Sequence, residues 1–322
     1  AALTTTQLRG MTTTQIGALD TADVAEFSAT QLGSLATTQI NAFSTTNLAA
    51  LDETQLGGLT STQIGRLTST NLSALDASQI TTLTTTQLSG LTALQIAGLN
   101  TTDVNELAST QLAAFAATQI AALNTTSFSA LDATQVSGLT ATQIAGLGTT
   151  IIRGLNETDI AELSTTQVGS LSALQLTWLT TTAFSALDAT QVQTLTNTQL
   201  RGMTGTQVAA LSTTDVLEFT STQIGSFATT QLGAFSTTNI SALDTTQLSG
   251  LTSTQLSRMS TTNLLALDAT QVGSLSNAQI AGLTVSQMRN LTTTDIATTA
   301  GASATEAAFR QSLQAALVSA GA

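Results

Sequence analysis

The side chains best suited to chemistry in this chain are carboxylates that recur at fixed spacing. Asp20, Asp23 and Glu26 lie three residues apart, and an Asp–Glu pair with the same spacing returns three times further along. Carboxylates three apart share one face of a helix, and carboxylate oxygens are ligands that calcium prefers. The candidate calcium ligands are therefore Asp20, Asp23, Glu26, Asp103, Glu106, Asp159, Glu162, Asp215 and Glu218.

A second interpretation of these carboxylates stays open, in which they form a solvated or Arg-paired stripe. The pattern lacks the glycine-bearing loop of EF-hands and of nonapeptide calcium repeats. Asp is also an ordinary residue at the N-cap and in the first turn of a helix. We therefore predict no required metal or cofactor and keep calcium as the alternative.

The composition argues against catalysis. The chain has no His, Cys or Tyr, and its seven basic residues are all Arg, so the usual general bases and activated nucleophiles are missing. A Ser-His-Asp triad cannot form. Only a carboxylate pair of the glycosidase kind remains, and no separate domain is present to hold it in a pocket. We predict that the chain is not an enzyme.

The elements that must position these carboxylates are eight-residue repeats, of which Thr12–Leu19 is a clean copy. We number the octad from its first Thr. Position 1 is Thr, Ser, Asp, Asn or Ala, position 4 is usually Gln, position 5 is Ile, Leu or Val, and position 8 is Leu, Phe or Met. Positions 1 and 4 match the S/T-x-x-Q capping box, which predicts that a helix begins in every octad.

The apolar positions 5 and 8 favour a helix over a strand. They share a helical face, whereas their opposite parity would send one of them into solvent in a strand. Helices of about seven residues do not survive alone in water, so neighbouring units must stack. We predict an all-α solenoid of very short capped helices, with a β-solenoid as the alternative fold.

A second period lies above the octad. Asp at position 1 recurs at gaps of 4, 3, 7, 7, 7 and 3 octads, and Thr4–Leu99 resembles Thr196–Leu291 at an offset of 24 octads. These gaps approximate whole turns if about 3.4 octads make one turn of a superhelix. The position-1 aspartates are Asp20, Asp52, Asp76, Asp132, Asp188, Asp244 and Asp268.

The predicted organisation is a solenoid over residues 1–299, a linker over 300–304 and a C-terminal helix over 305–322. Thr305 is the expected N-cap of that helix, and Gly321 lies where a C-cap often does. Phe309, Leu313 and Leu317 recur every four residues on it. We expect this helix either to cover the last coil or to dock on another chain.

The net charge of the chain limits the classes of partner that it can bind. The net charge is −12, which disfavours nucleic acid and anionic membranes, and no apolar run approaches the ~20 residues of a membrane span. On the 3.4-octad phase the arginines fall opposite the position-1 aspartates, so we expect two charged stripes that let copies pack side by side. The arginines assigned to assembly are Arg9, Arg66, Arg201 and Arg258.

The octads are similar to known repeats. Leu139–Leu147 resembles the L-T-x-x-Q-[ILV]-x-x-L repeats of large secreted or surface proteins of Gram-negative bacteria, and the resemblance covers Leu3 to about Ile296. It implies an extracellular or cell-surface location and a structural or adhesive role.

The chain begins inside a unit, with Ala1-Ala2-Leu3 and no cap. From this we expect a homopolymer that grows by end-to-end stacking of coils. The alternative is an adhesin stalk that displays a face for carbohydrate or another surface, with surface polysaccharide as its partner.

Overall fold

The computed structural model describes residues 3–294, and within them the chain is entirely helical. It contains 36 α-helices and no strand, one helix for each of the first 36 octads, so that helix number and octad number coincide. The predicted all-α solenoid is confirmed, and a β-solenoid is excluded for this part of the chain.

The helices fall into two compact units that divide between Leu155 and Asn156. The helices of the first unit are α1 (Thr5–Arg9), α2 (Thr13–Gly17), α3 (Thr21–Ala25), α4 (Ala29–Ser34), α5 (Thr37–Ile40), α6 (Thr45–Ala49), α7 (Glu53–Gly57), α8 (Ser61–Ile64), α9 (Ser69–Leu72), α10 (Ala77–Thr82), α11 (Thr85–Leu88), α12 (Ala93–Ala97), α13 (Thr101–Asn105), α14 (Ser109–Ala114), α15 (Ala117–Ile120), α16 (Thr125–Phe128), α17 (Ala133–Gly138), α18 (Ala141–Ala145) and α19 (Thr149–Gly154).

The helices of the second unit are α20 (Glu157–Ala161), α21 (Thr165–Ser170), α22 (Ala173–Trp178), α23 (Thr181–Phe184), α24 (Ala189–Thr194), α25 (Asn197–Gly202), α26 (Gly205–Ala209), α27 (Thr213–Leu217), α28 (Ser221–Ser226), α29 (Thr229–Leu232), α30 (Thr237–Ala242), α31 (Thr245–Ser249), α32 (Ser253–Arg258), α33 (Thr261–Leu264), α34 (Ala269–Gly273), α35 (Asn277–Ala281) and α36 (Val285–Thr294).

Most helices start at a capping box, as α18 shows. The Thr140 hydroxyl oxygen accepts a hydrogen bond from Gln143 N at 3.2 Å, and Gln143 Oε1 accepts one from Thr140 N at 2.7 Å. Two backbone donors at the helix start are thereby satisfied without tertiary partners. This local bond pattern explains why so short a sequence unit begins a helix at most octads.

Helices α1–α35 are four to six residues long, shorter than the seven that the octad length allows. The chain leaves the helical conformation by position 8, as at Leu139, where φ is −68° and ψ is 134°. The last described helix, α36, differs because it runs through Thr292, the expected cap of the next octad, to Thr294. The octad that would begin at Thr292 lacks an apolar residue at position 8.

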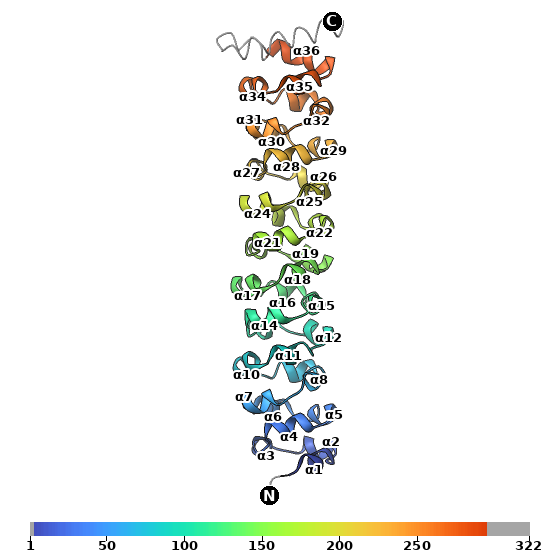
Figure 1. The fold of residues 1–322 in the computed structure, drawn as a ribbon, viewed down its shortest axis with the longest axis vertical. Coiled ribbons are helices and arrows are strands. Elements are labelled where there is room, and N and C mark those ends of the chain that lie inside the picture. The colour runs from blue at the N-terminus through green and yellow to red at the C-terminus, as the bar shows by residue number, and fades with distance from the viewer. Residues whose placement is uncertain (1–2, 295–322) are drawn as a thin grey trace. The chain divides into compact units, whose positions relative to one another are not determined.

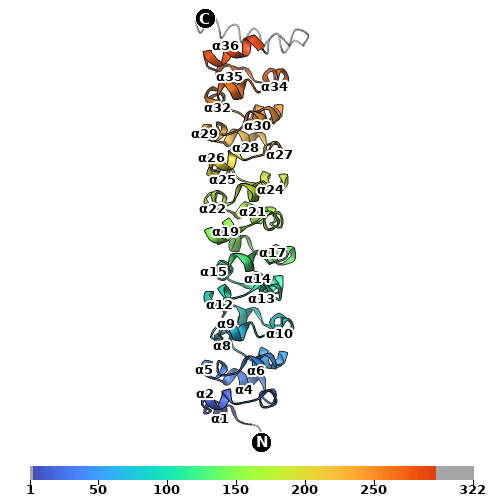
Figure 2. The ribbon, with the colours of Figure 1, turned by 180° about the vertical axis from the view of Figure 1, so that it is seen from behind.

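Within each unit the helices wind into successive coils, in which most helices pack against the one three octads later (Figures 1 and 2). Positions 5 and 8 form the core, and Ile144 and Leu147 of α18's octad are both buried, as the 3.6-residue period predicted. The chain therefore buries its apolar face only by stacking coil on coil.

Close coil contact depends on only one of two adjacent glycines at the end of α7. A Cβ added at Gly58 would meet the backbone carbonyl group of Ala29 in α4, whereas a Cβ at Gly57 would meet no atom within 4 Å. We expect Gly58→Ala to lower the free energy of unfolding by about 1–3 kcal/mol, because the backbones must separate.

Gly57→Ala is the matched control for that substitution. It should raise stability by about 0.5–1 kcal/mol through the lower entropy of the unfolded chain. Urea unfolding followed by far-UV circular dichroism measures both. Equal effects of the same sign would contradict the close approach of α4 and α7.

Candidate functional site

The glutamine at position 4 ties each coil to the preceding one. Gln143 Nε2 donates to the carbonyl oxygens of Leu112 and Phe115, both at 2.8 Å, which lie four octads earlier. The Gln143 side chain is only 2% exposed. Its amide therefore does two tasks: Oε1 caps its own helix and Nε2 joins the previous coil. Contacts three octads apart and hydrogen bonds four octads apart bracket the predicted 3.4 octads per turn.

The first coil carries the same side chains without these partners. Gln7 and Gln15 are exposed, and their Oε1 atoms accept only from the backbone nitrogens and hydroxyls of their own capping residues, Thr4 and Thr12. Among residues 3–294 nothing accepts a hydrogen bond from their Nε2 atoms. The first coil therefore exposes side chains whose equivalents in later coils are buried.

Apolar residues accompany those amides on the first coil. Met11 and Leu19 at position 8 are only half-buried, whereas every later position 8 through Leu291 is buried. Leu3 is 44% exposed. The first coil therefore combines free amide donors with exposed apolar surface.

One column in each unit lacks glutamine at position 4. Its helices succeed one another at intervals of three or four octads, which is the spacing of the coil contacts, so the short side chains lie above one another. The members of this short-residue column are Asp23, Asn47, Asn71, Asp103 and Ser127 in the first unit, where the longer Ile151 follows, and Asp159, Ala183, Asp215, Asn239 and Asn263 in the second.

Aspartate in the short-residue column uses a different bond to the previous coil. Asp103 Oδ2 accepts from the Ser73 hydroxyl at 2.8 Å, and Asp215 Oδ2 accepts from the Ser185 hydroxyl at 2.9 Å. A carboxylate has no proton to give the carbonyls that glutamine would reach. The shorter side chain of Asp103 also borders a void of about 10 Å³ in the apolar core.

The carboxylates nominated for calcium are partly used for capping. Asp20 Oδ1 accepts from Asp23 N and Asp23 Oδ2 accepts from Asp20 N, at 2.9 and 3.1 Å. Asp103, Asp159 and Asp215 are buried, whereas Glu106 and Glu218 are half-buried. Within residues 3–294 no three His, Cys, Asp or Glu side chains are grouped as a metal site would require.

The structure nevertheless brings like charges together in both units. Burial, with the charges of Asp103 and Asp76, raises the pKa of Glu106 above its ordinary value of 4.5. Burial, with the charges of Asp215 and Asp188, raises the pKa of Glu218 in the same way. Repulsion of this kind penalises the ionised form. Each cluster joins a position-1 Asp to an Asp–Glu pair three octads later.

We predict that Glu106→Gln stabilises the protein at neutral pH. The folded pKa of Glu106 is raised, so the folded state binds more protons than the unfolded chain, and stability falls as pH rises from 4.5 through the folded pKa. The substitution should remove this slope and raise Tm at neutral pH, with little effect below pH 4.5.

Glu53→Gln is the control for Glu106→Gln. It removes one exposed charge from the first turn of α7, where a carboxylate is favourable, and should not raise Tm. Thermal unfolding across the pH range measures both variants. A Tm gain from Glu106→Gln that is equally large in acid would contradict the proposed repulsion.

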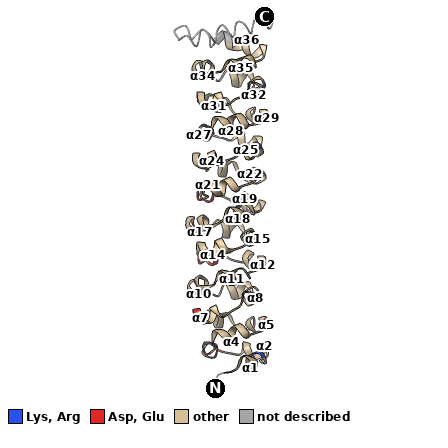
Figure 3. Cartoon of the chain, viewed as in Figure 1, with Lys and Arg blue, Asp and Glu red and all other residues tan. Residues whose placement is uncertain are grey.

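The arginines assigned to assembly are all exposed, and two of them bind the backbone of a neighbouring coil. Arg9 Nε donates to Ser34 O at 2.6 Å, and Arg201 Nε donates to Ser226 O at 2.9 Å. Both carbonyls end a helix, where a cation is favourable. Arg66 lines an open groove, and Arg258 ends α32. Charged residues are sparse along both units (Figure 3).

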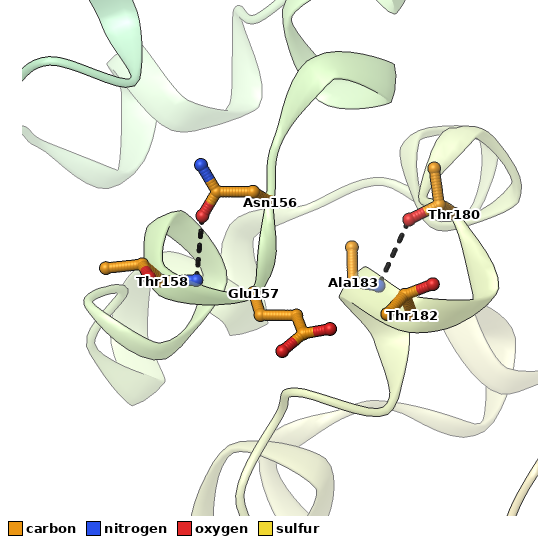
Figure 4. Close-up of a pocket in the computed structure, with 6 residues that line it drawn as sticks. All are labelled: Asn156, Glu157, Thr158, Thr180, Thr182 and Ala183. Carbon is orange, nitrogen blue, oxygen red and sulfur yellow. Dashed lines mark hydrogen bonds between the residues drawn. The ribbon is translucent and has the colours of Figure 1, made fainter.

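An open groove of about 350 Å³ lies in the second unit where the position-4 glutamine is replaced by Ala183 (Figure 4). Asn156, Glu157, Thr158, Thr180 and Thr182 line it together with Ala183. Its walls therefore offer amide, carboxylate and hydroxyl groups, which the sequence did not single out.

Three predicted assembly residues, Phe309, Leu313 and Leu317, lie outside the described residues. Within 3–294 no helix is long and apolar enough to cross a bilayer.

Comparison with known proteins gives one family. Residues 1–29, 16–53 and 224–261 match the model of the ALTTAQ repeat, and no curated protein matches the chain. The chain thus contains stretches similar to a Thr-rich repeat family, in agreement with the octads.

Proposed function

We propose that the chain is a structural, non-catalytic subunit of an extracellular filament or surface assembly, and that it polymerises by end-to-end stacking of coils. The observation that supports this proposal is the contact between successive coils, in which a position-4 amide such as that of Gln143 and the apolar residues at positions 5 and 8 are buried against the neighbouring coil. The extracellular location rests on the resemblance to secreted repeats.

The acceptors for such donors recur along the solenoid, and the carbonyl oxygens of Ile64 and Leu67, for example, each accept from Gln95. A first coil from a second copy would bring two amide donors and an apolar face to such carbonyls. A contact between unlike faces that does not close produces a filament.

The test replaces two atoms of the first coil. In Gln7→Glu/Gln15→Glu the capping oxygen is kept and each Nε2 donor becomes an oxygen, which repels the carbonyls of an incoming coil. We expect electron microscopy and light scattering to show filaments of the unchanged chain and single particles of the variant. Filaments from both would reject the proposed face.

Gln193→Glu is the control for charge. Gln193 is exposed at position 6 of α24, away from the capping positions, and its substitution should leave filaments intact. Repeating the microscopy with and without calcium asks whether the carboxylates contribute. Filaments that form only with calcium would indicate that the acidic clusters bind calcium.

The C-terminal segment has a separate test. Deleting residues 305–322 should shorten or abolish filaments if this segment bridges subunits, and unchanged filaments would reject the bridge.

Side-by-side packing through the charged stripes should weaken in high salt, because exposed charges are screened.

A second candidate function is an adhesin stalk with a carbohydrate-binding face. The groove beside Ala183 favours it, because its hydroxyl, amide and carboxylate groups can hydrogen-bond to sugar hydroxyls. This function predicts single particles that bind surface polysaccharide. Loss of that binding in Glu157→Ala/Thr182→Ala would support it, and unchanged binding would remove the groove from consideration.

A further inference from the structure

We propose that Asn100 and Asn156 are acceptor sites for N-glycosylation, in which a glycosyl group is transferred to the side-chain Nδ2 atom. Asn100 opens Asn-Thr-Thr and Asn156 opens Asn-Glu-Thr. Both tripeptides fit the Asn-x-Ser/Thr acceptor motif, in which the middle residue is not proline. The two asparagines are the N-caps of α13 and α20.

The motif alone does not select these two residues, because Ser and Thr are abundant in the chain. It also occurs at four other asparagines, where the structure gives the side chain a different environment. The six asparagines that begin the motif are Asn71, Asn100, Asn124, Asn156, Asn239 and Asn290.

At Asn100 and Asn156 the side-chain oxygen is occupied and the nitrogen is free. Asn100 Oδ1 accepts from Thr102 N at 2.7 Å and Asp103 N at 3.1 Å. Asn156 Oδ1 accepts from Thr158 N at 2.8 Å and Asp159 N at 3.1 Å.

Both asparagines are exposed, and in residues 3–294 neither Nδ2 atom donates a hydrogen bond. Figure 4 shows the Nδ2 end of Asn156 pointing away from Thr158 N. These nitrogens are therefore accessible to a transferase in the folded protein.

At two of the other asparagines the acceptor nitrogen is buried. Asn71 is 7% exposed and Asn239 is 3% exposed, and Asn239 Nδ2 donates to Leu211 O at 2.9 Å. A transferase would have to unfold the coil to reach either nitrogen.

At the remaining two the nitrogen is already bonded. Asn124 Nδ2 donates to the carbonyls of Ala97 and Leu99, both at 3.3 Å, and Asn290 Nδ2 donates to Ser286 O at 2.8 Å. Asn124 Oδ1 also accepts from Ser127 N in place of the amide two residues on. In the folded chain, two of the six motif asparagines therefore have an accessible Nδ2 atom, and the other four have one that is buried or already hydrogen-bonded.

The proposed reaction uses a nucleoside-diphosphate sugar as the donor and a transferase that recognises the motif. A bond forms between Asn Nδ2 and the anomeric carbon of the sugar, while the bond from that carbon to the diphosphate oxygen breaks. The nucleoside diphosphate leaves with the electron pair, and one Nδ2 proton passes to the transferase. The capping oxygen keeps its hydrogen bonds, so the helix start survives the modification.

The test treats the folded, full-length chain with a soluble asparagine glucosyltransferase and UDP-glucose, followed by peptide mapping with mass spectrometry. We expect one hexose on Asn100 and one on Asn156, and none on the other four. A proteolytic digest treated in parallel should accept hexose at all six motifs. Equal modification of Asn71 or Asn239 in the folded chain, or none at Asn100 and Asn156, would overturn the proposal.

Conservative variants guard against unfolding as an explanation. Asn100→Asp and Asn156→Asp keep a capping oxygen, as the native N-caps Asp76 and Asp132 show, but lack the amide nitrogen. Each should lose hexose at its own site with unchanged far-UV circular dichroism. Thr158→Ala, which keeps Asn156, should also lose it. Hexose retained on Asn156 in Thr158→Ala would refute the motif as the recognition element.

Discussion

Gln143→Glu is expected to lower the free energy of unfolding by about 3–5 kcal/mol at neutral pH, the cost of an uncompensated buried charge. The substitution keeps the oxygen that caps α18 but places a second oxygen against the carbonyls of Leu112 and Phe115. Two hydrogen bonds become repulsive contacts in a buried site. Urea unfolding followed by far-UV circular dichroism measures the loss.

Two controls accompany Gln143→Glu: measurement at lower pH, and the same substitution at an exposed glutamine. A buried carboxylate beside two carbonyls has a raised pKa, so the loss should shrink as pH falls and the acid becomes a donor. Gln15→Glu makes the same change at an exposed glutamine and should alter stability by no more than about 0.5 kcal/mol. Equal losses at both positions would show that capping, and not the bond to the previous coil, is what the substitution disturbs.

Phe227→Ala is expected to destabilise the second unit by about 3–5 kcal/mol. Phe227 is buried, and its ring lies edge-on between two others, with centroids 5.3 Å from Phe219 and 5.6 Å from Phe235. Such pairs contribute about 0.5–1.5 kcal/mol each beyond burial. Because the three residues occupy position 8 of consecutive octads, one truncation removes both ring contacts and leaves a cavity.

Fluorescence of Trp178, the only tryptophan and a residue of the same unit, can follow unfolding of Phe227→Ala. Phe227→Leu keeps most of the volume, loses the ring contacts and should cost less than half as much. If the two variants were equally unstable, the ring geometry and not the cavity would dominate the cost.

The local structure could be predicted from the sequence because it is determined within eight residues. The capping box at positions 1 and 4 starts most of the helices, and positions 5 and 8 fill the core. The superhelical period followed from recurring departures such as Asp132 and Asp188. These predictions needed no knowledge of which coils touch.

The second task of the position-4 glutamine could not be derived in this way. Its acceptors lie 28 and 31 residues earlier, at carbonyls that carry no sequence signal. One signal existed, because a capping box accepts Glu as readily as Gln, yet Glu never occurs at position 4. A strict preference for the amide indicates that its nitrogen has a partner.

The candidate sites were harder to predict for a related reason. The spacing of Asp103, Asp159 and Asp215 was visible in the sequence, but not that Asn, Ser and Ala share the same column. Nor does spacing reveal that these carboxyl groups are buried or that Asp103 binds Ser73.

The short-residue column also limits how such a gene can change its length. Duplicating seven or 24 octads restores the phase, so each new short residue joins the existing column. The resemblance of Thr4–Leu99 to Thr196–Leu291 is what a 24-octad duplication would leave behind. Gain of a single octad instead places an aspartate beside carbonyl oxygens that otherwise accept hydrogen bonds from a position-4 glutamine. We therefore expect recombination products that keep whole turns to remain stable, and products shifted by one octad to be less stable.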